Sequence, residues 1–181
     1  MNAEAPATVA AAECTIMFTD LVGFTEYTAL HGDAVALQLL AAQERIVREA
    51  LPAGSRIVKE LGDGLMLSFD GPCDAIETGL ALQERFEAEA ASADFPLWVR
   101  IGVHSGRPVP RGDDLVGNDV NIAARIVDLA APGEVITSEA TVNQAADDLE
   151  GIVFEPLGPA VIRGIPSPIP LFRAMREEDE G

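Results

Sequence analysis

The stretch SRIVKELGDGLMLSF, residues 55–69, decides the fold of this chain. Two runs typical of short strands, RIV and LMLSF, flank the tetrapeptide LGDG. A Gly-Asp-Gly triplet between such runs predicts a tight hairpin turn, because glycine accepts a positive φ without steric cost and aspartate tolerates it better than most residues. The turn would present Asp63 at the hairpin tip, with Lys59 on the incoming strand.

The segments on either side of this hairpin alternate between strand and helix patterns. A short apolar run rich in β-branched and aromatic residues predicts a mostly buried strand at 14–21, which ends in a strand-to-helix turn around Gly23. We expect Thr25 and Asn118 to cap the helices that follow them. The other expected elements are helices at 33–51, 72–90, 118–130 and 139–147, strands at 97–106, 134–138, 151–157 and 169–175, and a hairpin return at 107–117 with its turn near Arg111 and Gly112.

The order strand, helix, hairpin, helix, strand predicts an α+β fold. Its centre would be a ferredoxin-like βαββαβ core, with an antiparallel-rich sheet covered by helices on one face and with additional C-terminal strands and a helix. We expect one domain over residues 13–175, after a flexible lead-in at 1–12 and before an acidic tail at 176–181. Trp98 is expected in the core, and His31 and His104 are expected to be structural.

The composition restricts the classes of partner. A formal charge of −18 argues against a nucleic-acid or anionic-membrane surface, since both need a basic footprint. An anionic substrate would then have to be received by local positive groups or by bound cations. Cys14 and Cys73 match neither a disulfide framework nor a metal-knuckle spacing, and no apolar run reaches the ~18 residues of a membrane span. We therefore expect a cytoplasmic protein without a membrane span.

Two aspartates lie where strands end. Asp20 closes the apolar strand at 14–21, and Asp63 lies in the hairpin turn. Each alone is typical of an exposed turn or cap residue. In a β-α-β-β arrangement, however, the first strand and the hairpin can be neighbours, so the two carboxylates could bind a divalent cation that prefers oxygen ligands.

Two further patterns could serve an anionic substrate. In the helix at 118–130, Asn121, Arg125 and Asp128 form one polar stripe, which is either a solvent face with an Arg125–Asp128 pair or a face directed at a cleft. Residues 23–25 (Gly23, Phe24 and Thr25) form a candidate anion cradle, because backbone N–H groups at a helix start are free to bind phosphate.

Three motifs in one order and spacing carry a family resemblance: FTDLVGFT at 18–25, VKELGDG at 58–64 and DLVGNDVNIAAR at 114–125. With the closing IRGIPSPIPLFRA, they resemble the catalytic domain of class III nucleotidyl cyclases, the adenylyl and guanylyl cyclases, and the resemblance runs from about residue 15 to 173. It implies an adenylate cyclase, a lyase that converts ATP to 3′,5′-cyclic AMP and pyrophosphate.

The resemblance also implies roles for individual residues. Asp20 and Asp63 would bind two divalent cations, Mg²⁺ or Mn²⁺, and the main chain from Leu21 to Thr25 would hold a metal and the triphosphate. Lys59 and Asp114 match the pair that selects adenine. The other matched positions are the ribose-positioning Asn121, the transition-state Arg125, and Arg163, where the family often has a lysine that binds the triphosphate.

Assembly follows from the same resemblance. Active sites in the family form between two catalytic domains, so a chain that carries all six positions implies a homodimer with two equivalent sites. In such a dimer Asp63 would serve one site while Lys59 serves the other. The alternatives are a guanylyl cyclase, a catalytically silent cyclase-like dimerisation or nucleotide-sensing module, and a ferredoxin-like metal-binding protein.

Overall fold

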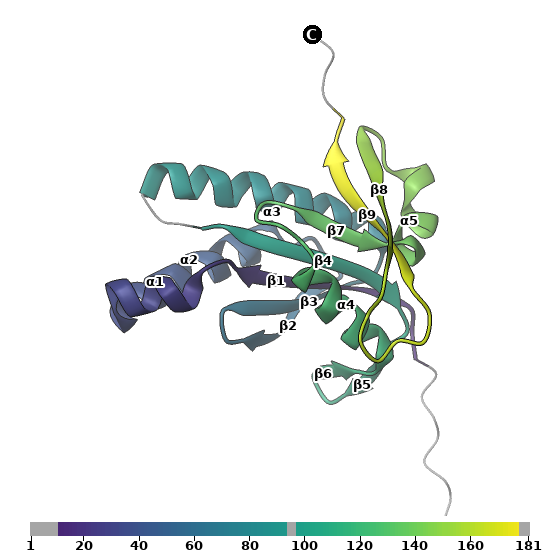
Figure 1. Cartoon of the computed structure of the whole chain (residues 1–181), viewed down its shortest axis with the longest axis horizontal. Helices are drawn as coiled ribbons and strands as arrows, with labels where there is room; N and C mark the ends of the chain where they lie inside the picture. The colour runs from purple at the N-terminus through teal and green to yellow at the C-terminus, as the bar shows by residue number, and fades with distance from the viewer. Residues whose placement is uncertain (1–10, 94–96, 178–181) are drawn as a thin grey trace, which may run out of the picture.

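The computed structural model describes residues 11–93 and 97–177, and most of its strands form one twisted sheet with helices packed on it (Figure 1). The predicted hairpin consists of β2 (Ser55–Leu61) and β3 (Gly64–Phe69), and it pairs through β3 with β1 (Cys14–Leu21). The remaining elements, in chain order, are α1 (Phe24–His31), α2 (Asp33–Ala50), α3 (Pro72–Ala93), β4 (Val99–Gly106), β5 (Val109–Arg111), β6 (Asp114–Val116), α4 (Asn118–Asp128), β7 (Val135–Ser138), α5 (Glu139–Ala145), the 3-10 turn η1 (Ala146–Asp148), β8 (Ile152–Ala160) and β9 (Ile169–Arg176).

The predicted ferredoxin-like core is confirmed. The strand order in the seven-stranded sheet is β2-β3-β1-β4-β7-β9-β8, and β1 is antiparallel to both of its neighbours, β3 and β4. β7 is parallel to β4, and β8 and β9 extend the sheet as an antiparallel pair. The hairpin at 107–117 has its turn between β5 and β6, and these two strands form a separate two-stranded ribbon rather than an extension of the main sheet.

Alternate residues of the central strands face two different helix layers. Met17 of β1 and Leu67 of β3 lie in the core that α2 and α3 cover, whereas Ile16 and Met66 pack against α4 on the opposite face (Figure 1). The expectation of helices on one face was therefore wrong in this detail. β1 carries apolar residues on both of its faces. The second face must therefore be covered as well, and α4 covers it.

Three smaller expectations also differ from the structure. The N-cap positions are Gly23 and Gly117, so Thr25 and Asn118 lie inside the first turns of α1 and α4. Both glycines have positive φ values, of 72° and 122°, which Thr and Asn would adopt at a cost. Trp98 is 52% exposed rather than part of the core. The predicted lead-in and acidic tail lie mostly at residues 1–10 and 178–181, outside the described residues.

Candidate active site

The hairpin turn brings the two predicted metal-binding carboxylates to one place. Asp20, near the end of β1, lies directly opposite Gly64 in the β1–β3 pairing, and Asp63 is the residue before Gly64. A Cβ atom on Gly64 would lie 2.5 Å from the main-chain oxygen of Thr19, so only glycine lets the turn approach β1 this closely. Glycine is thus required at the two positions for different reasons. Gly62 adopts the positive φ of the turn, 66°, and Gly64 allows the close approach of the turn to β1.

The electrostatics at this point suit a bound cation. Burial raises the pKa of the Asp63 carboxyl, and the neighbouring Asp20 carboxylate raises it further. The Arg100 guanidinium of β4 forms an ion pair with Asp20 and offsets part of this repulsion. Within residues 11–93 and 97–177 no group of three or more His, Cys, Asp or Glu side chains forms a metal cluster. Two carboxylates are what Mg²⁺ commonly takes from a protein, with substrate phosphates and water as its other ligands, so the residues fit such an ion.

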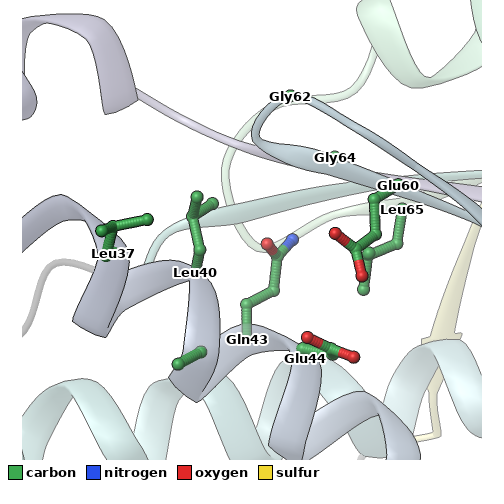
Figure 2. A pocket seen from close by; sticks show the side chains of 9 residues that line it. Leu37, Leu40, Gln43, Glu44, Glu60, Gly62, Gly64 and Leu65 are labelled. Carbon is green, nitrogen blue, oxygen red and sulfur yellow. The ribbon is translucent and has the colours of Figure 1, made fainter.

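A buried polar contact supports β1 and β3 behind this pair. The amide of Gln43 in α2, only 2% exposed, donates a hydrogen bond of 3.2 Å to the Thr19 hydroxyl oxygen, which also accepts one from the backbone N–H of Leu65. A pocket lies beside this contact, between α2 and the hairpin, and is shown in Figure 2. Its acidic lining, Glu44 and Glu60, makes it unsuitable for an anionic ligand.

Lys59 and Asp114 are brought together by an irregularity in the hairpin. The β2–β3 register pairs Ile57 with Leu67 but Lys59 with Met66, so Val58 is an extra residue in β2, a β-bulge. Leu67 belongs to the core under α2 and α3, whereas Met66 packs on the α4 face. In an unbulged strand residues 57 and 59 would share a face. The bulge therefore places Lys59 on the α4 face, opposite to Ile57.

The β5–β6 ribbon supplies the partner on that face. The Lys59 ammonium lies 2.9 Å from the Asp114 carboxylate, and the hydrogen bond that it donates holds the pKa of Asp114 below its ordinary value. The ribbon is held to β2 a second time, because Arg56 donates a hydrogen bond of 2.8 Å to the main-chain oxygen of Asp113. The backbone N–H of Leu115 donates to the second Asp114 oxygen and fixes the orientation of this carboxylate. The structure thus joins one donor and one acceptor that are 55 residues apart in the chain.

Helix α4 presents the other two predicted residues. Asn121 and Arg125 are both exposed, one turn apart on the same face, while the opposite side of the helix is buried against the sheet. Arg125 lies 3.8 Å from Asp128, and both side chains are more than half exposed, so this pair contributes little to stability. Gly102 allows α4 to lie directly on β4, since a Cβ atom there would meet the backbone nitrogen of Val127 at 2.4 Å.

The remaining predicted residues lie at the junction of β1 with α1 and in the loop between β8 and β9. Leu21 is the buried last residue of β1, and Gly23 is the left-handed residue that starts α1, which contains Phe24 and Thr25. The first N–H groups of such a helix lack partners within the helix and can receive an anion. Arg163 is exposed in the loop between β8 and β9.

Comparison with known proteins adds to this geometry. A model of the family described as the adenylate and guanylate cyclase catalytic domain matches residues 8–172. The chain belongs to this family. It is 31% identical over 172 residues to the pH-sensitive adenylate cyclase MT1302 of Mycobacterium tuberculosis. The aligned region covers 92% of this chain and 41% of that protein. The chain spans less than half the length of curated relatives that it matches.

Solved cyclase structures have the same fold. The chain matches the adenylyl cyclase CyaB from P. aeruginosa with a TM-score of 0.79 at 22% identity, covering 92% of this chain and 95% of that one. It matches an adenylate/guanylate cyclase/hydrolase from Silicibacter pomeroyi with a TM-score of 0.78 at 26% identity, covering 92% and 98%. The guanylate cyclase domain of RhGC from Catenaria anguillulae, solved with GTP, gives 0.75 at 18% identity, covering 93% and 98%. Because adenylate and guanylate cyclases share this fold, the fold alone does not select the base.

Sequence reasoning missed some residues of this candidate site. Arg100, which pairs with Asp20, and Arg56, which holds the ribbon, lie in strands where an alternating pattern gives no sign of their partners. The Val58 bulge was also missed. The position of Lys59 was the one available signal for the bulge. In a regular strand, Lys59 would lie on the same face as Ile57, and that face packs against the core. Among the described helices, none has both the length and the apolar character needed to cross a membrane.

Proposed function

We propose that this chain is an adenylyl cyclase, which converts ATP to 3′,5′-cyclic AMP and pyrophosphate at sites shared between the two subunits of a homodimer. The observation that carries the proposal is the Lys59–Asp114 pair, 2.9 Å apart on the α4 face of the sheet. Adenine presents an amino donor at N6 and an acceptor at N1. A carboxylate that accepts and an ammonium that donates match this pattern, whereas guanine reverses it at O6 and N1–H.

The other residues have roles that follow from their chemistry. Asp20 and Asp63 would hold two divalent cations, Mg²⁺ or Mn²⁺. When bound, these cations supply Lewis acidity, which favours ionisation of the ribose 3′-hydroxyl and neutralises charge on the phosphates. Asn121 orients the ribose so that its 3′-oxygen lies in line with the α-phosphorus and the departing pyrophosphate.

Two arginines and a helix start would receive the phosphates. Arg125 stabilises the charge that develops on the α-phosphate, because its planar guanidinium can address two oxygens at once. The main chain from Leu21 to Thr25 and the side chain of Arg163 hold the triphosphate. No covalent intermediate with the protein is required, since positioning and electrostatics suffice for an in-line displacement.

Exposed apolar side chains support assembly with a second copy. Three of them lie within four residues of a site residue in the chain: Leu61 before Asp63, Leu129 after Arg125, and Val161 before Arg163. Their exposures are 46%, 52% and 84%, respectively. In the proposed dimer the second subunit would cover these side chains. In a symmetric dimer, the carboxylates of one subunit would meet the α4 residues of the other.

The competing functions differ in specific features. A guanylyl cyclase would need an acceptor facing N1–H and a donor facing O6, the reverse of what Lys59 and Asp114 offer to adenine. A silent sensing module would be expected to have lost at least one of the six site positions. All six are present in the chain.

One assay separates these possibilities. With Mg²⁺ or Mn²⁺, the purified protein should have a kcat/KM for cyclic AMP formation from ATP at least tenfold higher than that for cyclic GMP formation from GTP. This ratio corresponds to about 1.4 kcal/mol of discrimination. Equal rates would contradict the assignment of Lys59 and Asp114. Absence of both products with ATP still binding would favour the sensing module.

Mixing of inactive variants tests the shared site. Asp20→Ala removes the metal half of a site and Arg125→Ala removes the α4 half, so each homodimer should be inactive. In a heterodimer, one of the two sites receives both intact halves, and activity should return. Lack of recovery, with subunit exchange shown by differently tagged chains, would contradict sites shared between subunits.

A further inference from the structure

A buried polar network that the proposed chemistry does not use lies where β4, β7, α4 and α5 meet. His104 of β4 is only 5% exposed, and its Nδ1 and Nε2 atoms lie 2.6 Å from the Ser138 Oγ and 3.2 Å from the Asp119 Oδ1, respectively. Ser138 Oγ lies 3.3 Å from the Thr141 hydroxyl oxygen. The network continues to β1 through Ser105, whose backbone N–H donates to Thr141 and whose hydroxyl contacts Thr15; Ser105, Thr15, Ser138 and Thr141 are all buried.

The direction of these hydrogen bonds fixes the state of His104. An ionised Asp119 can only accept, so the His104 Nε2 must carry a proton and donate it. Burial lowers the pKa of His104 and favours the neutral ring, in which Nδ1 is then an acceptor. Ser138 donates to Nδ1, and Thr141 can donate to Ser138. One tautomer of a neutral His104 therefore satisfies every group along this path.

The far end of the path is the first turn of α4. Asp119, the second residue of this helix, also accepts a hydrogen bond of 2.8 Å from the backbone N–H of Arg107 through Oδ2. A Cβ atom on Gly106 would lie 2.3 Å from the Asp119 Cγ, so a glycine at the end of β4 makes room for this carboxylate. Asp119 thus holds the start of α4 to the end of β4. Two residues later the same helix presents Asn121, and Arg125 follows one turn after that.

We propose that His104 is a positioning residue: through Asp119 it fixes the start of α4, and thereby the placement of Asn121 and Arg125 over the substrate. This inference rests on the proposed cyclase function. The buried apolar face of α4 sets the distance of the helix from the sheet, but apolar contacts are not directional. The hydrogen bonds of Asp119 are directional, and they define the rotation and axial position of the helix.

Two substitutions at residue 104 separate shape from hydrogen bonding. His104→Phe fills a similar space without a donor, and His104→Gln keeps an amide N–H that can reach Asp119. We expect His104→Phe to lower kcat by about 10²-fold, since a displacement near 1 Å can cost that much, with a smaller change in KM. His104→Gln should recover at least tenfold of this loss. Equal activity of the two variants would contradict the proposal.

Heterodimers show which half of the site His104 serves. His104→Phe has an intact metal half, so mixing it with Asp20→Ala should restore activity, whereas mixing it with Arg125→Ala should not, because both chains then have a defective α4. Recovery with Arg125→Ala would place the defect in the metal half, and recovery with neither partner would indicate a general folding role. Either result would overturn the proposal.

Two controls keep the outcome clear. The pair Asp20→Ala with Arg125→Ala, measured in parallel, tests the shared site itself, so its failure would count against the proposed assembly and not against His104. If His104→Phe does not fold, Asp119→Ala tests the same path from its partly exposed end and should show the same recovery pattern. The double variant of His104 and Asp119 should lose no more activity than the worse single variant, because both act through one contact.

Discussion

Lys59 and Asp114 satisfy one another in the absence of a base, and the cost of separating them is small. Their side chains are 35% and 37% exposed, and ion pairs at such exposed sites contribute little to stability. A base that replaces both partners can therefore open the pair, whereas a base that replaces neither leaves two charges without partners. Base selection thus depends on the pattern of donor and acceptor, and not on the charge of the pair.

Exchanging the two charges should reverse this preference. In the double variant Lys59→Glu and Asp114→Lys, an ion pair remains but the donor and acceptor have changed places. We expect the ratio of kcat/KM for ATP over GTP to fall by at least about tenfold, with overall folding preserved. Competition assays with both nucleotides measure this ratio. An unchanged ratio would show that these side chains do not contact the base.

Asp63 should link cation binding to stability. Addition of Mg²⁺ or Mn²⁺ should raise the Tm of the unaltered protein, because the cation binds only the folded arrangement of Asp20 and Asp63. Asp63→Asn should abolish activity and most of this increase. Glu60→Gln, three residues away and outside the carboxylate pair, is the matched control and should retain the increase. A similar response of the Asp63→Asn protein to Mg²⁺ would exclude this site as the place of binding.

At the scale of elements, α4 depends on two glycines of β4. Gly102→Ala would drive a methyl group against the backbone of Val127, which cannot move alone, so the helix must lift from the sheet. We expect a loss of about 1–3 kcal/mol in the free energy of unfolding, typical of overpacking, together with reduced activity. Gly71→Ala is the control, because its Cβ would meet nothing within 4 Å and its φ is ordinary. Urea denaturation compares the two, and equal stability would contradict this packing.

The contact of His104 with α4 also predicts a pH dependence of stability. Its folded-state pKa is lowered by burial, and Asp119 is the charged group that opposes this shift, while Ser138 and Thr141 are uncharged. As the pH falls below about 6.5, the unfolded chain binds a proton first, so stability is lost on the acidic side. The Tm should therefore fall more between about pH 7.5 and 5.5 in the unaltered protein than in His104→Gln. Parallel curves would contradict this.

Elements with a strong period were predictable from sequence, and features set by tertiary contact were not. The hairpin at 55–69 and the strand at 14–21 have the predicted places, because turn glycines and apolar runs are local signals. The reason for Gly64 lies in a neighbouring strand, and the caps at Gly23 and Gly117 follow from backbone conformation. The partners of Arg100 and the bulge at Val58 depend on pairings that the sequence does not encode locally.

At the scale of the whole molecule, activity should depend on protein concentration. If each site needs two subunits, dilution below the dimer dissociation constant should lower specific activity, and the loss should follow the decrease in dimer. Activity and molecular mass measured over the same dilution series test this relation. Constant specific activity in a sample that is monomeric by mass would show that one chain suffices.

The bulge in β2 has a consequence for how this hairpin can tolerate changes in length. Val58 is one residue more than the pairing with β3 requires, and its side chain packs on the α4 face of the sheet. Deleting Val58 would leave Ile57 opposite Leu67 and Lys59 opposite Met66, and every side chain would keep its face. Deleting a residue between Lys59 and the turn would instead shift Lys59 to the other face. Deletions in this hairpin are therefore unequal in effect, although their positions differ by only one or two residues.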